Sequence, residues 1–124
     1  MTTTYLSGGE PFLLPAGRRG ALLVHGFTGL PRDMRPVGDA LQKAGVTALG
    51  VRLAGHATEI DDLLRNHWHD WYQSVLDGYH LLCGCCDDVV VIGLSMGAVL
   101  SLRLAAEQPV RGVVTMSAPS ILHF

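Results

Sequence analysis

The feature that most constrains this chain is a serine between two glycines, at the junction of a strand-like and a helix-like segment. Residues 89–92 read Val-Val-Val-Ile, and such β-branched residues are typical of a strand. They run into Gly93-Leu94-Ser95-Met96-Gly97, and an apolar segment that favours a helix follows to Glu107. A serine on a strained turn between strand and helix is the pattern of a nucleophile elbow. The alternative is an ordinary turn that carries a buried serine.

The two glycines and the start of the helix both suit a nucleophilic serine. We expect side chains at positions 93 and 97 to collide with the neighbouring strand and helix. The first N–H groups of a helix have no intrahelical acceptor and carry partial positive charge, so they stabilise a developing oxyanion. Met96 is therefore the predicted donor of one backbone N–H.

A second glycine-rich segment follows the first apolar run of the chain. Ala21-Leu22-Leu23-Val24 predicts a strand buried on both faces, and His25-Gly26-Phe27-Thr28-Gly29 comes directly after it. An oxyanion hole in an elbow enzyme takes its second N–H from such a loop, and Phe27 is the candidate. His25 has two interpretations: a residue that shapes the loop, which we favour because it sits at a strand end before a glycine turn, or a catalytic base.

Strand-like and helix-like segments alternate along the rest of the chain, after a lead-in at 1–20 that prolines and glycines interrupt. The predicted strands cover 21–24, 46–51, 89–92 and 110–116, and the predicted helices cover about 34–44, 68–82 and 96–107. The last helix is apolar on most sides, so we expect it to be buried. Alternation of this kind predicts an α/β fold with a parallel sheet and crossover helices. Residues 21–124 are the predicted folded domain.

Composition excludes several classes of function. The net charge of −2 and the lack of a basic stripe argue against a nucleic-acid partner. No apolar run is long enough to cross a bilayer, and the Thr/Ser/Gly-rich start lacks a secretory pattern, so we expect a cytoplasmic protein. Cys83, Cys85 and Cys86 have only His80 nearby as a fourth ligand, so we expect reduced thiols in a loop after the helix and no metal.

Several segments together resemble a known family. They occur in the expected order over roughly residues 20–120 and read A-L-L-V-H-G-F-T-G-L, G-V-T-A-L-G-V-R-L-A-G-H, W-x-x-W-Y, V-I-G-L-S-M-G-A and G-V-V-T-M-S-A-P. The chain is similar to bacterial carboxylesterases and monoacylglycerol lipases of the α/β-hydrolase superfamily, in their N-terminal half.

The resemblance implies hydrolysis of short- to medium-chain carboxylic esters through an acyl-enzyme on Ser95. It implies oxyanion donors at Phe27 and Met96, and no cofactor. It places His56 in a Gly-His loop near the active-site face, without a catalytic role. The implied strand order is second, first, third, fourth, in a partial fold without the lid and the C-terminal strands.

The residues after Ser95 depart from the family's pattern. A triad in the order Ser, acid, His needs an acid on a later strand and a histidine on a later loop. The only acid that follows is Glu107, at the far end of a helix, and the only histidine is His123. We therefore expect this chain to be inactive or nearly so, and we expect it to self-associate through an open edge at 110–116.

Two other functions fit the same residues. One is a noncatalytic α/β-hydrolase-like domain that binds a small ligand or a partner. The other is a different acyl-enzyme chemistry, such as that of an acyltransferase, a thioesterase or a peptidase, because an elbow serves all of these reactions.

Overall fold

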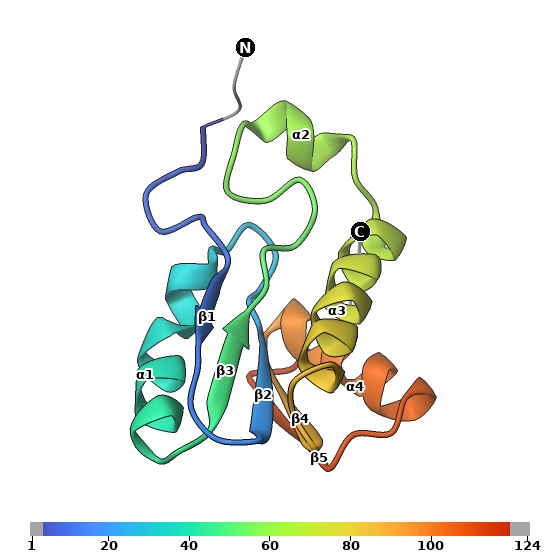
Figure 1. The fold of residues 1–124 in the computed structure, drawn as a ribbon. Coiled ribbons are helices and arrows are strands. Elements are labelled where there is room, and N and C mark those ends of the chain that lie inside the picture. Colours follow the sequence, from blue (N-terminus) through green and yellow to red (C-terminus); the bar gives the residue numbers. More distant parts are fainter. Residues whose placement is uncertain (1–3, 120–124) are drawn as a thin grey trace.

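A mostly parallel sheet organises residues 4–119, which are the residues that this computed structural model describes (Figure 1). Its strands are β1 (Phe12–Leu14), β2 (Arg19–Val24), β3 (Thr47–Gly50), β4 (Asp88–Leu94) and β5 (Gly112–Met116). The helices are a 3₁₀ turn (Pro31–Met34), α1 (Arg35–Lys43), α2 (Ile60–Leu64), α3 (Trp68–Cys83) and α4 (Met96–Glu107).

The strand order is β1-β3-β2-β4-β5, and every neighbouring pair except β1–β3 is parallel. The predicted order of the four parallel strands is therefore confirmed. Because β2 and β4 are neighbours that run parallel, the loops that follow them leave the sheet at the same ends of the strands. Val24 of β2 is paired with Gly93 of β4, which brings the two loops side by side.

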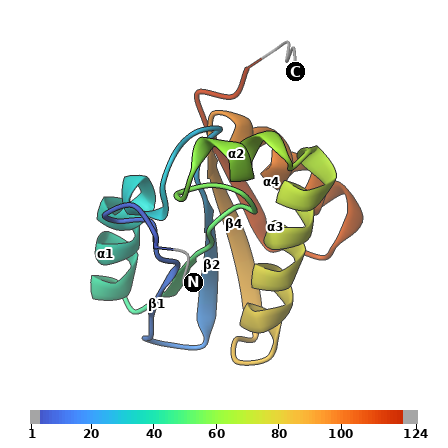
Figure 2. The ribbon, with the colours of Figure 1, turned by 90° about the horizontal axis from the view of Figure 1, so that it is seen from above.

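Helices cover both faces of the sheet, with α1 on one side and α3 and α4 on the other (Figure 2). The alternation of side chains along β2 explains how one strand serves both layers. Leu22 and Val24 pack in the cluster under α3 and α4, whereas Ala21 and Leu23 pack in the cluster under α1. The strand β2 is therefore apolar on both faces, as expected for a strand in the middle of a parallel sheet.

The antiparallel strand β1 was not predicted. It lies in the segment that we interpreted as a lead-in, and it pairs with β3 from Phe12 to Leu14. Three residues between Pro11 and Pro15 are too few to show a period. Prolines are tolerated beside an edge strand because one side of such a strand makes no ladder bonds. The division of the chain at residue 20 stays a prediction.

Two helices also differ from expectation. The short helix α2 was missed, because five residues are too few for helical periodicity to show. The prediction that α4 is buried on most sides is wrong for its outer face, where the Leu102 side chain is 47% exposed, while Leu100 and Leu104 are buried. The other predicted helices and strands begin and end within about two residues of the expected positions.

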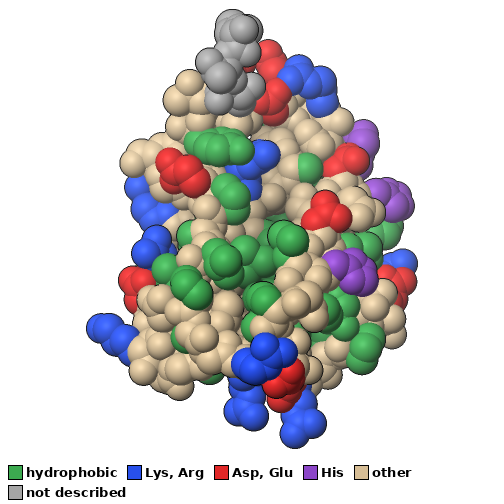
Figure 3. All heavy atoms as spheres, viewed as in Figure 1, with side chains coloured by type: hydrophobic (Ala, Val, Ile, Leu, Met, Phe, Trp, Pro, Cys, Tyr) green, Lys and Arg blue, Asp and Glu red, His purple; other side chains and the backbone are tan. Residues whose placement is uncertain are grey.

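Charged side chains of both signs lie around the rim of the face shown in Figure 3, and hydrophobic side chains show across its middle. Ion pairs such as Arg18–Asp87 and Arg35–Asp39 are exposed, and pairs of this kind contribute little to stability. None of the helices between residues 4 and 119 combines the length and the apolar character that a membrane span requires.

Candidate active site

Ser95 is the single residue between β4 and α4, and residues other than glycine rarely adopt its backbone conformation. Its φ is 57° and its ψ is −119°, and its side chain is exposed at the edge of the sheet. A hydrogen bond of 2.8 Å from Ser95 N–H to the Met116 carbonyl ties this strained residue to β5. The helix α4 begins at Met96, so the Met96 N–H lies at the helix N-terminus, beside the serine.

Gly93 and Gly97 are where the sequence required them, because a Cβ at either position would overlap backbone atoms. At position 93 it would meet the Gly97 carbonyl, and at position 97 it would meet the carbonyls of Val24 and His25. The first contact packs α4 against its own strand, and the second lets the end of β2 approach the first turn of α4. The expected collisions are confirmed.

The loop after β2 approaches Ser95 through Gly26. A Cβ at position 26 would lie 3.4 Å from the Ser95 Cβ and 3.3 Å from the Leu94 carbonyl oxygen. The loop is closed by hydrogen bonds from Gly29 N–H to the Gly26 carbonyl, at 3.0 Å, and from Leu30 N–H to Asp33 Oδ2, at 2.9 Å. The structure thus brings the residue before Phe27 into contact range of the serine.

His25 is fully buried, and both of its ring nitrogens are engaged. Its Nε2 accepts a hydrogen bond of 3.1 Å from Leu53 N–H, so the proton is on Nδ1, which lies 2.8 Å from the Gly26 carbonyl and donates to it. Burial lowers the pKa of His25 to about 4, although the bond to Gly26 acts in the opposite direction. This arrangement supports the loop-shaping interpretation over that of a base.

The Phe27 ring belongs to an aromatic cluster that the sequence did not reveal. Its centroid lies 5.3 Å from that of Trp71 and 5.8 Å from that of His56. His56 is buried, its Nδ1 is 3.1 Å from the Ala54 carbonyl, and its Nε2 has no hydrogen-bond partner within residues 4–119. Burial lowers the pKa of His56, so the ring is neutral near pH 7. Gly55-His56 and the W-x-x-W-Y segment both belong to the family-like segments of the sequence, but nothing in either indicates that they pack together.

Between Ser95 and residue 119, no acidic or basic side chain is placed to act on the serine as the acid or the base of a triad. Glu107 ends α4 and pairs with other groups: it accepts a 2.6 Å hydrogen bond from the Tyr72 hydroxyl and lies 3.1 Å from the Arg103 guanidinium. Helix α4 spans 12 residues, which at 1.5 Å per residue separates Glu107 from Ser95 by about 18 Å. His123 lies outside the described residues.

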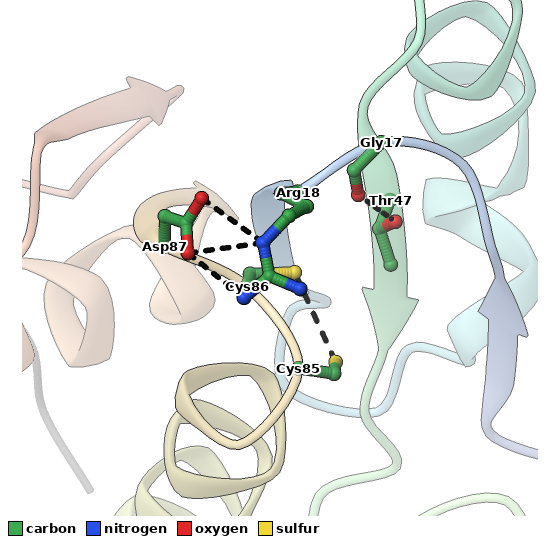
Figure 4. Close-up of polar contacts among 6 residues, drawn as sticks. All are labelled: Gly17, Arg18, Thr47, Cys85, Cys86 and Asp87. Atoms are coloured by element: carbon green, nitrogen blue, oxygen red, sulfur yellow. Dashed lines mark hydrogen bonds and ion pairs between the residues drawn. The ribbon is translucent and has the colours of Figure 1, made fainter.

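Cys85 and Cys86 lie near the beginnings of β2 and β4 (Figure 4), and Ser95 follows the other end of β4. Cys83, Cys85 and Cys86 are free, and the sulfurs of Cys85 and Cys86 are 3.8 Å apart. Arg18 bridges to Asp87 beside them, at 2.8 to 3.0 Å. In the described part of the chain no group of three or more His, Cys, Asp or Glu residues is placed to hold a metal ion.

Relatives of known name match the chain over most of its length. It is 48% identical to a thermostable monoacylglycerol lipase of Bacillus sp. (strain H-257) over 114 residues, which are 91% of this chain and 46% of that protein. It is 36% identical to a carboxylesterase of Bacillus subtilis (strain 168) over 111 residues, which are 89% of this chain and 45% of that protein. The chain thus spans about half the length of these curated relatives.

The fold matches a solved lipolytic enzyme as well. A structure described with LipS and LipT, two metagenome-derived lipolytic enzymes, superposes with a TM-score of 0.87 at 32% identity, covering 90% of this chain and 46% of that one. The sequence pattern of the alpha/beta hydrolase family matches residues 21–123. With the elbow, the sheet order and these matches in agreement, the chain belongs to the alpha/beta hydrolase family.

Proposed function

We propose that this chain carries the nucleophile and the oxyanion hole of a carboxylic ester hydrolase, similar to carboxylesterases and monoacylglycerol lipases. The observation that supports it most is the exposed, strained Ser95 at the N-terminus of α4, with Gly26 packed against it. A monoacylglycerol lipase and a carboxylesterase are among the relatives that share this region. The proposed substrates are small esters with short- to medium-chain acyl groups.

The proposed reaction uses an acyl-enzyme. The Ser95 Oγ attacks the ester carbonyl carbon and loses its proton, and the carbonyl oxygen becomes an oxyanion that accepts hydrogen bonds from the N–H groups of Phe27 and Met96. The tetrahedral intermediate then expels the alcohol, which takes up a proton, and leaves an acyl group on Ser95. Water hydrolyses the acyl-enzyme in a second round of the same chemistry. The scheme needs no cofactor.

The base for both proton transfers is the part that residues 4–119 do not supply. His25 already binds Leu53 and Gly26 through its two nitrogens, and Glu107 binds Tyr72 and Arg103. An unactivated serine is a weak nucleophile at neutral pH, and an oxyanion hole alone leaves only residual catalysis. We therefore propose that the 124-residue chain hydrolyses a nitrophenyl ester far more slowly than ordinary esterases do. Self-association through β5 and a cytoplasmic location stay predictions.

Labelling with a fluorophosphonate tests the role of Ser95 without requiring turnover. We expect slow, stoichiometric modification that intact-mass measurement detects and that Ser95→Ala abolishes. Ser117→Ala is the matched control, because Ser117 is also exposed and also has a positive φ, of 55°, but the described residues that follow it, Ala118 and Pro119, are not helical. Labelling that survives Ser95→Ala, or that Ser117→Ala removes, would contradict the proposal. So would ordinary esterase turnover in the Ser95→Ala variant.

A further inference from the structure

Two thiol groups lie side by side in the turn that joins α3 to β4. The sulfurs of Cys85 and Cys86 are 3.8 Å apart, which is within hydrogen-bond distance for sulfur. Neighbouring side chains in an extended segment point to opposite sides, so it is the turn after α3 that brings these two together (Figure 4). We call Cys85 and Cys86 the thiol pair.

The two members of the thiol pair differ in their access to solvent. Cys85 is exposed, whereas Cys86 is only 7% exposed and packs in the core cluster under α3 and α4. A Cβ at position 20 would lie 2.9 Å from the Cys86 sulfur, so this thiol is packed closely against the start of β2. A dissolved reagent therefore reaches Cys85 first, and the Cys86 sulfur is in contact with the thiol under attack.

A guanidinium group lies beside the thiol pair (Figure 4). Arg18 bridges to Asp87 at 2.8 Å, and its charge also interacts favourably with a thiolate at Cys85 or Cys86. Burial raises the pKa of the Cys86 thiol, and Arg18 acts in the opposite direction. The thiolate is the form of cysteine that attacks an electrophile, and a neighbouring cation favours it. Arg18 therefore promotes reaction at the thiol pair, while Asp87 offsets part of its charge.

The third cysteine is set apart from the thiol pair by its place on the helix. Cys83 is the last residue of α3, and it interacts with the Tyr79 hydroxyl one turn earlier. Cys85 lies beyond the helix end, where its thiol is 3.7 Å from the Leu81 carbonyl oxygen. Cys83 is also exposed, so it provides an internal control for simple accessibility.

We propose that the thiol pair is a site of reversible oxidation by hydroperoxides, in which Cys85 attacks and Cys86 completes the disulfide. The Cys85 sulfur attacks the terminal oxygen of the hydroperoxide and loses its proton. The O–O bond breaks, the leaving oxygen takes up a proton, and Cys85 becomes a sulfenic acid. The Cys86 sulfur then attacks the Cys85 sulfur and loses its proton, and the S–O bond breaks to release water. Two thiols are oxidised to one disulfide, and the hydroperoxide is reduced to an alcohol and water, or to two waters.

The disulfide between these neighbours is expected to be easily reduced. Consecutive Cα atoms are about 3.8 Å apart, whereas disulfide-linked Cα atoms are usually about 4.4 to 6.8 Å apart. The sulfurs must also approach from 3.8 Å to about 2.0 Å. Strained or exposed disulfides have oxidising potentials, so a small thiol reduces them. The pair of free thiols is therefore the resting form, and a mild reductant should restore it. The proposal is independent of the proposed function.

Treatment of the dilute 124-residue chain with hydrogen peroxide tests the proposal. Intact-mass measurement should show the loss of two hydrogens, and the number of thiols that iodoacetamide labels after denaturation should fall from the three cysteines of the chain to one. Dithiothreitol should restore all of them. A product that keeps every thiol, or that is a disulfide-linked dimer, would overturn the proposal.

Single variants assign the roles of the three cysteines. Cys83→Ser is the matched control and should still lose two hydrogens. Cys85→Ser should slow peroxide consumption at least about tenfold, because the remaining thiol of the pair is buried. Cys86→Ser should stop at a sulfenic acid on Cys85 that dimedone traps, and Cys86→Ala, which places no hydroxyl in the core, should do the same. Loss of the disulfide in Cys83→Ser, or its formation in either Cys86 variant, would contradict the assignment.

Two charge variants test the contribution of the ion pair. Arg18→Gln should slow the oxidation about threefold, and Asp87→Asn should accelerate it by a similar factor, because the first removes and the second releases the positive charge beside the sulfurs. Arg35→Gln is the matched control, since Arg35 forms a comparable exposed ion pair with Asp39 on α1. Equal rates in the parent and in both charge variants, or an equal effect of Arg35→Gln, would exclude the role of Arg18.

Discussion

At the scale of single residues, the strain at Ser95 is retained because its surroundings leave it no relaxed alternative. A non-glycine residue in such a conformation costs about 1 to 3 kcal/mol. On one side of Ser95, its N–H donates to the Met116 carbonyl. On the other side, the carbonyls of Val24 and His25 lie so close to Gly97 that they fix the start of α4. Because the requirement for glycine is local, the spacing of the motif was enough to predict this geometry.

Acidification tests the buried state of His25. Its pKa is lowered by burial to about 4 in the folded chain, against 6.5 for an exposed histidine, so protons bind more tightly to the unfolded state. The contribution of His25 to stability is therefore complete above pH 6.5 and is lost as the pH falls toward 4, by about 3 kcal/mol in total. Urea denaturation between pH 7 and pH 4 measures this loss.

His25→Gln is the variant that isolates the effect from other titrating groups. We expect it to lower stability at pH 7, since a flexible glutamine side chain holds the acceptor for Leu53 N–H less rigidly than the imidazole ring does, and to flatten the loss between pH 6.5 and 4. A smaller slope should remain, because burial also lowers the pKa of the neighbouring His56, whose ring centroid is 5.1 Å away. Equal pH slopes in the parent and the variant would show that His25 is not buried as a neutral ring.

The candidate site could be predicted only where its determinants are close in the sequence. Ser95, Met96 and Gly97 form one turn, and His25 to Phe27 form one loop, so pattern and spacing identified both. The packing of Phe27 against His56 and Trp71 depends on three segments that meet only in the folded chain. Nothing in the local sequence of any one of them indicates that contact.

At the scale of elements, hydrophobic periodicity predicted the long helices and strands and missed the short ones. The helix α3 has 16 residues and shows its buried stripe in the sequence, although Trp68, at its first position, is partly exposed. The strand β1 and the helix α2, with three and five residues, have too few positions to display a period. The predicted burial of helix α4 was too extensive, because apolar composition alone does not indicate which face of a helix packs against the sheet.

The two leucines near the middle of α4 test this correction. Leu104 is fully buried under the sheet, so Leu104→Ala should destabilise the chain by about 2 to 5 kcal/mol through lost packing and a cavity. Leu102 is 47% exposed, so Leu102→Ala should change stability by no more than about 0.5 kcal/mol. Urea denaturation of both variants measures the difference. Similar losses from the two substitutions would restore the expectation of a helix buried on most sides.

At the scale of the whole molecule, the two edges of the sheet are protected differently. The edge strand β1 has three residues and is flanked by Pro11 and Pro15, which limit ladder bonds with another chain. At the other edge, β5 pairs with β4 and, within residues 4–119, with no further strand. It has five residues, contains no proline, and carries partly exposed Val113 and Val114.

We therefore expect the chain to self-associate through β5, because an apolar edge with unpaired backbone groups binds another edge. Light scattering over a range of concentrations should show a mass that rises with concentration. Val114→Lys should shift the chain toward the monomer, since a lysine on an edge strand opposes pairing, and the Val114 side chain is 50% exposed, so the fold tolerates the change. Leu13→Lys, at a comparably exposed position on β1, is the matched control and should leave association unchanged. A mass that stays monomeric at every concentration would rule out the open edge as a binding surface, and equal dispersal by both lysines would assign the effect to net charge instead of to β5.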